Sequence, residues 1–525
     1  MTQSLASRLQ HLLDSGAYRH LAECRIGLER ESLRVSPEGR IAQTPHPQAL
    51  GAALTHPAIT TDFSEALTEV ITSPCASVGA VLAELGEIQK FVSLHLDEEL
   101  MWAGSMPCVV EGGDSIPIAE YGDSNIGMMK KVYRRGLGYR YGRTMQVIAG
   151  VHFNYSFSEA FWREFQRLEG DAQTLQDFKS ERYMGMIRNI LRYGWLIPYL
   201  FGASPAVCKS FLRGKPTLLS SFSKGTAYEE YATSLRMGNI GYTNNKESLS
   251  GIKANYNSLH DYVESLDCAI RTPFAEYEAI GVKVDGEYRQ LNANILQIEN
   301  EYYSTVRPKQ APGKTEMPIH ALRDRGIEYV ELRSLDINMF EPLGVSAEQL
   351  YFLEVFMLYC LLRPSAVLSE SEIDEIDINL LLVAHNGRKP SMMLQCNDSP
   401  VSLKEWASRL MLAMQPVAAI LDRARQSTHY SASLKAQCAC IGDVSKTPSA
   451  RILRAMRDHQ EEYFYFAKRM SVLHQQFFAG QPISPAAVDR LTHMAQQSIA
   501  RKQQIEAADA IDFDTFLRQY YAQSL

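Results

Sequence analysis

The chain has 525 residues, of which 46% are hydrophobic and 22% are charged, a composition that is ordinary for a folded globular protein. Its net charge of -7 argues against nucleic acid as a partner, because no basic stripe dominates the sequence. The sequence has no apolar run of membrane-spanning length and no secretory signal pattern, so we expect no membrane association, a cytoplasmic location and reduced thiols.

Hydrophobic periodicity along the chain predicts strands that are separated by long helices. The predicted strands are Arg25–Val35, Glu69–Thr72, Thr144–Phe157, Leu291–Asn300 and Ile327–Ile337. The predicted helices include Val78–His95, Phe178–Leu200, Leu259–Arg271, Ala347–Leu362 and Leu403–Arg425. The stretch rich in proline, glycine and lysine from Arg307 to Met317 is the best candidate for a mobile loop. Few connections follow a β-α-β pattern, which favours an antiparallel sheet that carries helices, the α+β class.

The first predicted strand contains two carboxylates that are two residues apart. Side chains alternate along a strand, so Glu29 and Glu31 should project from one face and Arg30 from the other. Two like charges on a core strand repel one another and are costly to desolvate. A cation between them removes both costs, and oxygen ligands favour a hard ion such as Mg²⁺.

Two further segments carry acidic or metal-binding residue types on or beside predicted strands. Asp62 and Glu69 form a second acidic cluster, although taken alone they are also compatible with the acidic first turn of a helix. His152 alternates with Asn154 and Ser156 along a predicted strand, and this polar face either meets solvent or lines a site. A lone histidine is more often structural than a metal ligand, so His152 is a candidate ligand only in combination with the acids.

The last predicted strand places Glu331 and Arg333 on a common face. An arginine beside a carboxylate suits metal-bound phosphate, and the alternative is an ion pair at the surface of the sheet. Together, this many acids on or beside core strands predict a phosphoryl-transfer site that holds several Mg²⁺ ions. The sequence has no P-loop motif and no kinase signature set, so ATP should bind a site built on the sheet.

Eight segments of the chain resemble the proteobacterial (type 1) glutamate–cysteine ligase family, also called γ-glutamylcysteine synthetase. They are Gly27–Val35, Leu54–Thr72, Met101–Met106, Gln146–Ser156, Gly194–Pro205, Tyr231–Asn244, Leu296–Tyr303 and Gly326–Asn338. The resemblance implies a glutamine-synthetase-like fold, whose mostly antiparallel active-site sheet forms a funnel with helices around it. Residues 1–400 would then be the catalytic region, and residues 401–525 a helical C-terminal region packed on the same domain.

The same resemblance implies the first step of glutathione biosynthesis. ATP would phosphorylate the γ-carboxylate of L-glutamate, and the amino group of L-cysteine would attack the resulting γ-glutamyl phosphate. The products would be γ-glutamylcysteine, ADP and phosphate. The family also implies several Mg²⁺ ions with Mn²⁺ as a tolerated substitute, feedback inhibition by glutathione, and a monomer.

Site residues follow from the family pattern. The implied metal ligands are Glu29, Glu31, Asp62, Glu69, His152 and Glu331. Arg333 would contact the transferring phosphoryl group and Arg236 a substrate carboxylate, while Arg134 would be a mobile residue at the edge of the cysteine pocket. The implied walls of that pocket are Phe63, Tyr133, Leu137, Gln146, Tyr242 and Tyr303. Aromatic and apolar walls suit a thiol, which is a weak hydrogen bonder, although core packing explains such residues equally well without the resemblance.

Two other functions remain open at the level of sequence. One is a carboxylate–amine ligase of the same fold that uses a different acceptor amine. The other is a non-catalytic binding protein that keeps the fold, and the retention of every implied metal ligand argues against it.

Overall fold

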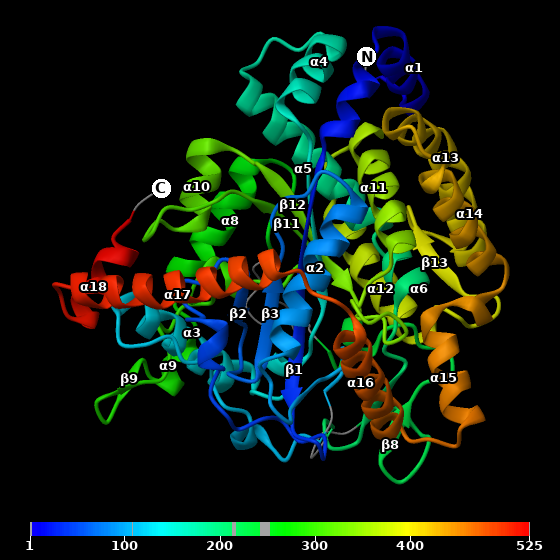
Figure 1. Cartoon of the computed structure of the whole chain (residues 1–525). Coiled ribbons are helices and arrows are strands. Elements are labelled where there is room, and N and C mark those ends of the chain that lie inside the picture. Colours follow the sequence, from blue (N-terminus) through cyan, green and yellow to red (C-terminus); the bar gives the residue numbers. More distant parts are fainter. Residues whose placement is uncertain (1–2, 108, 213–216, 242–252, 524–525) are drawn as a thin grey trace.

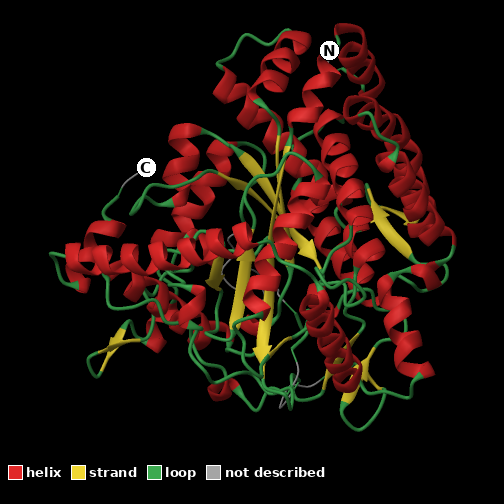
Figure 2. Cartoon of the chain, viewed as in Figure 1, coloured by secondary structure: helices red, strands yellow, loops and turns green. Residues whose placement is uncertain are grey.

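The computed structural model describes residues 3–107, 109–212, 217–241 and 253–523. A central sheet lies in the middle of the molecule, and helices surround it (Figures 1 and 2). Its strands follow the order β11-β12-β5-β1-β3-β2, and β4 pairs with the end of β1. The bounds are β1 Arg25–Val35, β2 Ile59–Thr61, β3 Leu67–Ile71, β4 Leu100–Met101, β5 Val151–Ser156, β11 Val306–Lys309 and β12 Tyr329–Leu335. All of these pairings are antiparallel, which confirms the predicted α+β class.

Smaller sheets and the helices complete the architecture. The small sheets pair β6 (Ala206–Cys208) and β7 (Ser220–Ser221) with β8 (Thr226–Tyr228), β9 (Lys283–Val284) with β10 (Glu287–Tyr288), and β13 (Met393–Cys396) with β14 (Ser399–Ser402). The helices before residue 401 are α1 Leu5–Ser15, α2 Val78–Ser93, α3 Asn125–Tyr141, α4 Glu159–Glu169, α5 Leu175–Tyr193, α6 Leu196–Phe201, α8 Leu259–Arg271, α9 Ala275–Ile280, α10 Pro318–Arg325, α11 Ala347–Leu362 and α12 Glu370–Asn386. The later helices are α13 Leu403–Arg425, α14 His429–Gly442, α15 Pro448–Asp458, α16 Tyr463–Gly480, α17 Pro485–Ala508 and α18 Phe513–Tyr521.

Local sequence signals set the start of the helices that flank the site. The hydroxyl of Ser77 accepts a hydrogen bond from the backbone N–H of Ala80 and so caps α2. Ser124 caps α3 in the same way. Ser346 and Gln349 form a reciprocal capping box at the start of α11. The apolar α11 is buried on nearly all sides because it packs against α2, α5, α13 and α14.

The C-terminal helices pack onto the earlier part of the chain. Helices α13 and α14 lie side by side, and α13 also contacts the short helix η1 (Ala17–Glu23). Helix α17 runs across α2, and α18 packs against α3 (Figure 1). One buried apolar cluster extends from Leu9 to Tyr520, so both parts of the chain contribute to one core. The division at residue 400 stays a prediction.

One predicted strand is wrong. The segment Leu291–Asn300 has an irregular backbone that leads into the short helix η6 (Glu299–Glu301). Two of its backbone donors are satisfied by side chains, because Leu291 N–H donates to Gln297 Oε1 at 3.0 Å and Gln297 N–H donates to Glu301 Oε2 at 2.8 Å. These side chains, together with the backbone carbonyls of Ala269 and Thr272, take the place of a neighbouring strand.

Three other predicted elements have different bounds. The strand predicted over Thr144–Phe157 begins only at Val151, after a short helical turn η4 (Met145–Val147). The helix predicted over Phe178–Leu200 is divided into α5 and α6 around Gly194. The predicted loop from Arg307 is wrong at its start, because Arg307–Lys309 belong to β11 and pair with β12.

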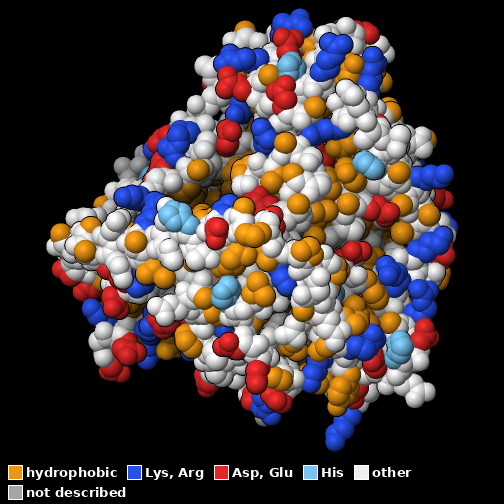
Figure 3. Space-filling model, viewed as in Figure 1, with side chains coloured by type: hydrophobic (Ala, Val, Ile, Leu, Met, Phe, Trp, Pro, Cys, Tyr) orange, Lys and Arg blue, Asp and Glu red, His pale blue; other side chains and the backbone are white. Residues whose placement is uncertain are grey.

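The surface, the helices and the cysteines bear on the expectations from composition. Basic and acidic side chains are interspersed on the face shown in Figure 3. Among the described residues, no helix combines the length and the apolar character that a bilayer crossing requires. Seven described cysteines carry free thiols, namely Cys24, Cys75, Cys268, Cys360, Cys396, Cys438 and Cys440. Cys208 departs from the expectation of reduced thiols because it is in a disulfide bond.

A buried carboxyl group, Glu354 of α11, lies behind the central sheet. It accepts a hydrogen bond from the Tyr430 hydroxyl at 2.9 Å, and the Tyr155 hydroxyl lies 3.5 Å away. The Arg425 guanidinium is 3.7 Å from the same carboxyl group. Burial raises the pKa of Glu354 to about 7, even though Arg425 acts in the opposite direction.

Glu354 should therefore make the stability of the fold depend on pH. Its pKa of about 7 in the folded chain exceeds the value of roughly 4.3 expected after unfolding, so its contribution is complete below pH 4.3 and is lost as pH rises through 7. We expect the unfolding free energy of wild type minus that of Glu354→Gln to fall between pH 5 and pH 8 in urea titrations. The exposed Glu348→Gln on the same helix is the control, and a Glu354 difference that stays constant with pH would refute the assignment.

Candidate active site

Four strands of the central sheet carry acidic side chains and one histidine to a common face. Glu29 and Glu31 are separated by one residue on β1, so they project from the same side. The strand register places Glu29 opposite His152 of β5, and Glu31 opposite Glu69 of β3. Strand β12 brings Glu331 from the other side of β5. His152 consequently lies at the centre of the acids.

Two groups of potential metal ligands result, and they share His152. The first contains Glu29, His152 and Glu331, the second contains Glu31, Glu69 and His152, and the ligand atoms in each group lie within 4.8 Å of one another. His152 Nδ1 is 3.1 Å from the Glu29 carboxylate and 3.5 Å from that of Glu331. His152 Nε2 is 3.7 Å from the Glu31 carboxylate. Carboxylates with a single imidazole are a donor set that suits Mg²⁺ or Mn²⁺.

The acids of the second group repel one another, and the cations that act on them, Arg236 and Arg333, do not offset burial and this repulsion. Burial raises the pKa of Glu69 well above its usual range, and the neighbouring carboxylates of Glu29, Asp62 and Glu31 raise it further. Burial also raises the pKa of Glu31, although that carboxylate accepts a hydrogen bond from the Gly150 backbone N–H at 2.8 Å. A bound cation would relieve this repulsion and keep both groups ionised.

Glu331 has the opposite electrostatic environment. Burial acts to raise its pKa, but Lys309 and Arg333 together outweigh burial and hold the pKa well below its usual range. Arg333 NH1 lies 3.0 Å from Glu331 Oε1, and Lys309 Nζ lies 3.5 Å from Glu331 Oε2. The site thus pairs an acid-rich side with a cationic side, as a metal-bound phosphate requires.

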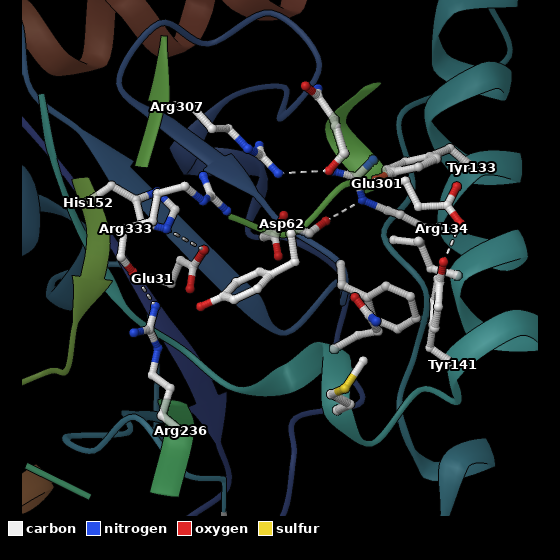
Figure 4. A pocket seen from close by; sticks show the side chains of 16 residues that line it. Glu31, Asp62, Tyr133, Arg134, Tyr141, His152, Arg236, Glu301, Arg307 and Arg333 are labelled. Carbon is white, nitrogen blue, oxygen red and sulfur yellow. Dashed lines mark hydrogen bonds and ion pairs between the residues drawn. The ribbon is translucent and has the colours of Figure 1, made fainter. Parts of the chain in front are cut away.

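A pocket of about 110 Å³ opens beside the two ligand groups (Figure 4). Glu31, His152 and Arg333 lie on one side of it, and residues of α3 lie on the other. Asp62, the sixth implied ligand, belongs to neither ligand group but lines this pocket. The structure therefore brings five of the six implied ligands together and places Asp62 next to them.

The implied cysteine-pocket residues also lie here, from several elements. Tyr133 and Leu137 are one turn apart on α3, Phe63 lies between β2 and β3, Gln146 lies in η4, and Tyr303 precedes β11. All five line the pocket. Burial raises the pKa of the Tyr133 hydroxyl well above its usual range. The sixth implied residue, Tyr242, lies outside the described residues.

Arg134 is held at the edge of the pocket by three neighbours. Its Nε donates a hydrogen bond to the backbone carbonyl of Asp62, and its NH1 donates to the Lys130 carbonyl at 3.0 Å. The guanidinium also lies 4.7 Å from the centre of the Tyr121 ring. Whether Arg134 moves, as the family resemblance implies, stays a prediction.

The two implied substrate arginines lie on the other side. Arg236 is buried, and its NH2 donates to the Arg333 carbonyl at 2.8 Å while its NH1 is 3.8 Å from Asp336 Oδ1. Burial would lower the pKa of Arg333, but Glu331 and Glu31 outweigh burial and raise it. A Cβ atom at Gly150 would overlap the Arg236 guanidinium, so any larger residue there would displace this arginine.

Several residues of the site were missed by sequence reasoning. Asn154 donates a hydrogen bond to Glu29 Oε1 at 2.8 Å, a contact that its alternation with His152 along β5 already suggests. Arg307 lines the pocket and pairs in register with Glu331. It was missed because its segment was predicted to be a loop. Glu301 lines the pocket and forms a buried ion pair with Arg140 at 2.8 Å.

Comparisons with known proteins identify the family of the chain. A family model described as glutamate-cysteine ligase matches residues 9–383. The glutamate–cysteine ligase of Pseudomonas paraeruginosa is 46% identical over 525 residues, covering 100% of this chain and 99% of the relative. The enzyme of the same name from Alcanivorax borkumensis is 45% identical over 522 residues, covering 98% of this chain and 99% of the relative.

Solved structures of similar fold point to the same family. The chain matches a crystal structure of glutamate–cysteine ligase from Francisella tularensis in complex with AMP at a TM-score of 0.89 and 36% identity, covering 95% of this chain and 97% of that one. It also matches a bifunctional glutathione synthetase from Pasteurella multocida at a TM-score of 0.72 and 25% identity, covering 94% of this chain and 58% of that one. This chain belongs to the glutamate–cysteine ligase family.

Proposed function

We propose that this protein joins the γ-carboxylate of L-glutamate to the amino group of L-cysteine at the expense of ATP. The products are γ-glutamylcysteine, ADP and phosphate, and the reaction is the first step of glutathione biosynthesis. The observation that carries the proposal is the pair of ligand groups that share His152 beside Arg333, in a chain that matches the family along nearly its whole length.

The proposed reaction proceeds through an acyl phosphate. An oxygen of the glutamate γ-carboxylate attacks the γ-phosphorus of ATP and ADP leaves, which converts a poor electrophile into a good one. The cysteine nitrogen then attacks the carbonyl carbon, the C–O bond to phosphate breaks, and the nitrogen loses a proton. Arg333 and Arg307 both line the pocket and are placed to neutralise charge on the transferring group.

We propose Mg²⁺ as the resident metal, with Mn²⁺ as a substitute. The residues fit such ions because the half-buried carboxyl group of Glu69 makes no hydrogen bond to any described side chain or backbone group, and three other acids surround it. Glu29, Glu31, Glu69, His152 and Glu331 would hold the ions, with Asp62 close by. When bound, the ions would neutralise the phosphates of ATP and fix their orientation.

The pocket lined by Phe63, Tyr133 and Leu137 is proposed to hold the cysteine substrate. Gln146 is buried at its wall, and its side-chain amide makes no hydrogen bond to another described residue, so it is available to a ligand. Arg236, beside Arg333, is proposed to bind a substrate carboxylate. Inhibition by glutathione, which contains both substrate moieties, and a monomeric state are further proposals from the family resemblance.

Replacing Gln146 by alanine should separate the two amino-acid sites. We expect the KM for L-cysteine to rise about 10-fold, because one hydrogen bond to the substrate is lost, while the KM for L-glutamate changes less than about 2-fold. Steady-state kinetics with each substrate varied in turn measures both values. The exposed Gln173→Ala is the control, and equal changes in the two KM values would show that Gln146 does not belong to the cysteine pocket.

The proposed activity is tested by supplying Mg-ATP and L-glutamate with a panel of amines and measuring ADP release and product mass. Cysteine-dependent ADP release and the mass of γ-glutamylcysteine are the expected result. ADP release that follows a different amine would retain the mechanism but change the acceptor. A folded protein that releases no ADP with any amine would instead be a binding protein of this fold.

A further inference from the structure

A small cavity lies on the face of β1 that is opposite the acidic site. It is enclosed by β1, by α2 and by α16, three elements that are far apart in sequence and pack together in the fold (Figure 1). Its volume is about 20 Å³. Its polar lining includes Arg30 of β1, Gln89 of α2 and His474 of α16. None of these residues has a role in the proposed ligase reaction.

Arg30 brings a positive charge to this cavity without an acidic partner. Its side chain is 3% exposed, its NH1 donates to Gln89 Oε1 at 2.5 Å, and its Nε has no hydrogen-bond partner. No carboxylate among the described residues lies within 4.0 Å of its guanidinium. A guanidinium stays protonated in proteins, and a buried charge without a counter-charge is costly.

Arg34 lies on the same face of β1 and, unlike Arg30, has an acidic partner. It is 1% exposed, and its NH1 lies 2.7 Å from Glu99 Oε2. Glu99 also lines the cavity, but its other oxygen accepts a hydrogen bond from the Thr44 hydroxyl at 2.5 Å. Both oxygens of the acid at the cavity are therefore engaged elsewhere, and the charge of Arg30 remains uncompensated.

His474 supplies a second donor. Its ring is 6% exposed, and neither ring nitrogen makes a hydrogen bond to another described residue. Burial and the nearby Arg30 together lower its pKa to about 4, although the Met339 backbone acts in the opposite direction. The imidazole is thus neutral at pH 7 and offers one N–H. The neighbouring Lys90 adds a further buried cation, although its ammonium donates to the Phe478 carbonyl.

We propose that this cavity binds a single monovalent anion of the size of chloride, held by the Arg30 guanidinium and the N–H of His474. A cavity of about 10–15 Å³ is sufficient for a water molecule. The volume of about 20 Å³ therefore suits one monatomic ion and excludes phosphate or a nucleotide. The ion would lie directly behind the acids, because Arg30 separates Glu29 from Glu31 along β1.

Crystals grown or soaked in sodium bromide test the site directly. We expect an anomalous bromide peak within hydrogen-bond distance of the Arg30 guanidinium and of one ring nitrogen of His474. The absence of a peak at this position, with bromide visible elsewhere in the crystal, would overturn the proposal. Density that carries no anomalous signal would identify a water molecule and would overturn it equally.

Thermal unfolding in solution gives an independent test. We expect the Tm of wild type to rise more in sodium chloride than in sodium gluconate of equal ionic strength, because only the small anion binds the folded chain. Arg30→Met should lose this chloride-specific increment, and Arg25→Met, at the exposed start of the same strand, should retain it. Equal responses of wild type to both salts, or a chloride increment that survives in Arg30→Met, would contradict the proposal.

Arg30→Met should fold, since an unpaired buried charge is replaced by an apolar side chain of similar length. If it does not, His474→Phe provides a second variant, in which a ring without an N–H occupies the same wall. It should show a chloride-specific rise in Tm that is smaller than in wild type. A rise equal to that of wild type would show that the ion does not lie beside His474.

Discussion

Replacing Glu69 by glutamine should make the metal-free protein more stable while removing most of its activity. The carboxyl group of Glu69 is surrounded by those of Glu29, Asp62 and Glu31, and burial together with these neighbours raises its pKa well above the usual range. Glutamine keeps the shape but removes the repulsion, so we expect the Tm at pH 8 without metal to rise by about 1–3 °C. Loss of a metal ligand should lower kcat by about 100-fold or more.

Added Mg²⁺ distinguishes this explanation from a general effect on packing. Mg²⁺ should raise the Tm of wild type, because it binds only the folded chain, and should raise that of Glu69→Gln much less. The exposed Glu98→Gln is the control and should match wild type in both measurements. Wild-type turnover by Glu69→Gln, or a Tm that falls without metal, would show that Glu69 is not a repelled metal ligand.

The second large effect is expected at Arg333. Its guanidinium lies 3.0 Å from Glu331 and lines the pocket, where it can neutralise charge on the transferring phosphoryl group. Arg333→Met should therefore lower kcat by about 1,000-fold, with a smaller change in the KM for L-glutamate. Single-turnover formation of ADP measures this step without a contribution from product release.

Arg333→Lys is the matched variant, since it keeps the charge but loses the planar, bidentate donor geometry. It should recover part of the lost rate and remain well below wild type. Recovery to the wild-type rate would mean that charge alone is needed. An unchanged kcat with a raised KM for ATP would place Arg333 in ground-state nucleotide binding instead of phosphoryl transfer.

The acidic face of the site could be predicted from sequence because strand alternation is a local rule. Glu29 and Glu31 project from one face of β1 because the side-chain period of a strand is two, whatever the partners of the strand are. The same rule placed Glu331 with Arg333, which the structure confirms at 3.0 Å. Which strands lie next to one another could not be derived in this way, since β12 pairs with β5 across a long sequence separation.

The cationic side of the site was not predicted from the sequence, because its residues flank a proline. Arg307 and Lys309 alternate with Pro308, and a proline near glycines is typical of a loop. Strand β11 tolerates Pro308 because it lies at the edge of the sheet, where a missing N–H does not break a central ladder. The segment Leu291–Asn300 was predicted as a strand but is irregular, because the side chains of Gln297 and Glu301 accept two of the hydrogen bonds that a strand partner would otherwise accept.

We expect the two ligand groups that share His152 to hold the divalent cations on which the reaction depends. A crystal structure with Mn²⁺ and a non-hydrolysable ATP analogue, with anomalous difference maps at the manganese edge, tests it most directly. We expect one peak between Glu31, Glu69 and His152 and another near Glu29 and Glu331, at about 2.0–2.3 Å from the carboxylate oxygens. Manganese peaks away from these acids, or none at all with the nucleotide bound, would contradict it.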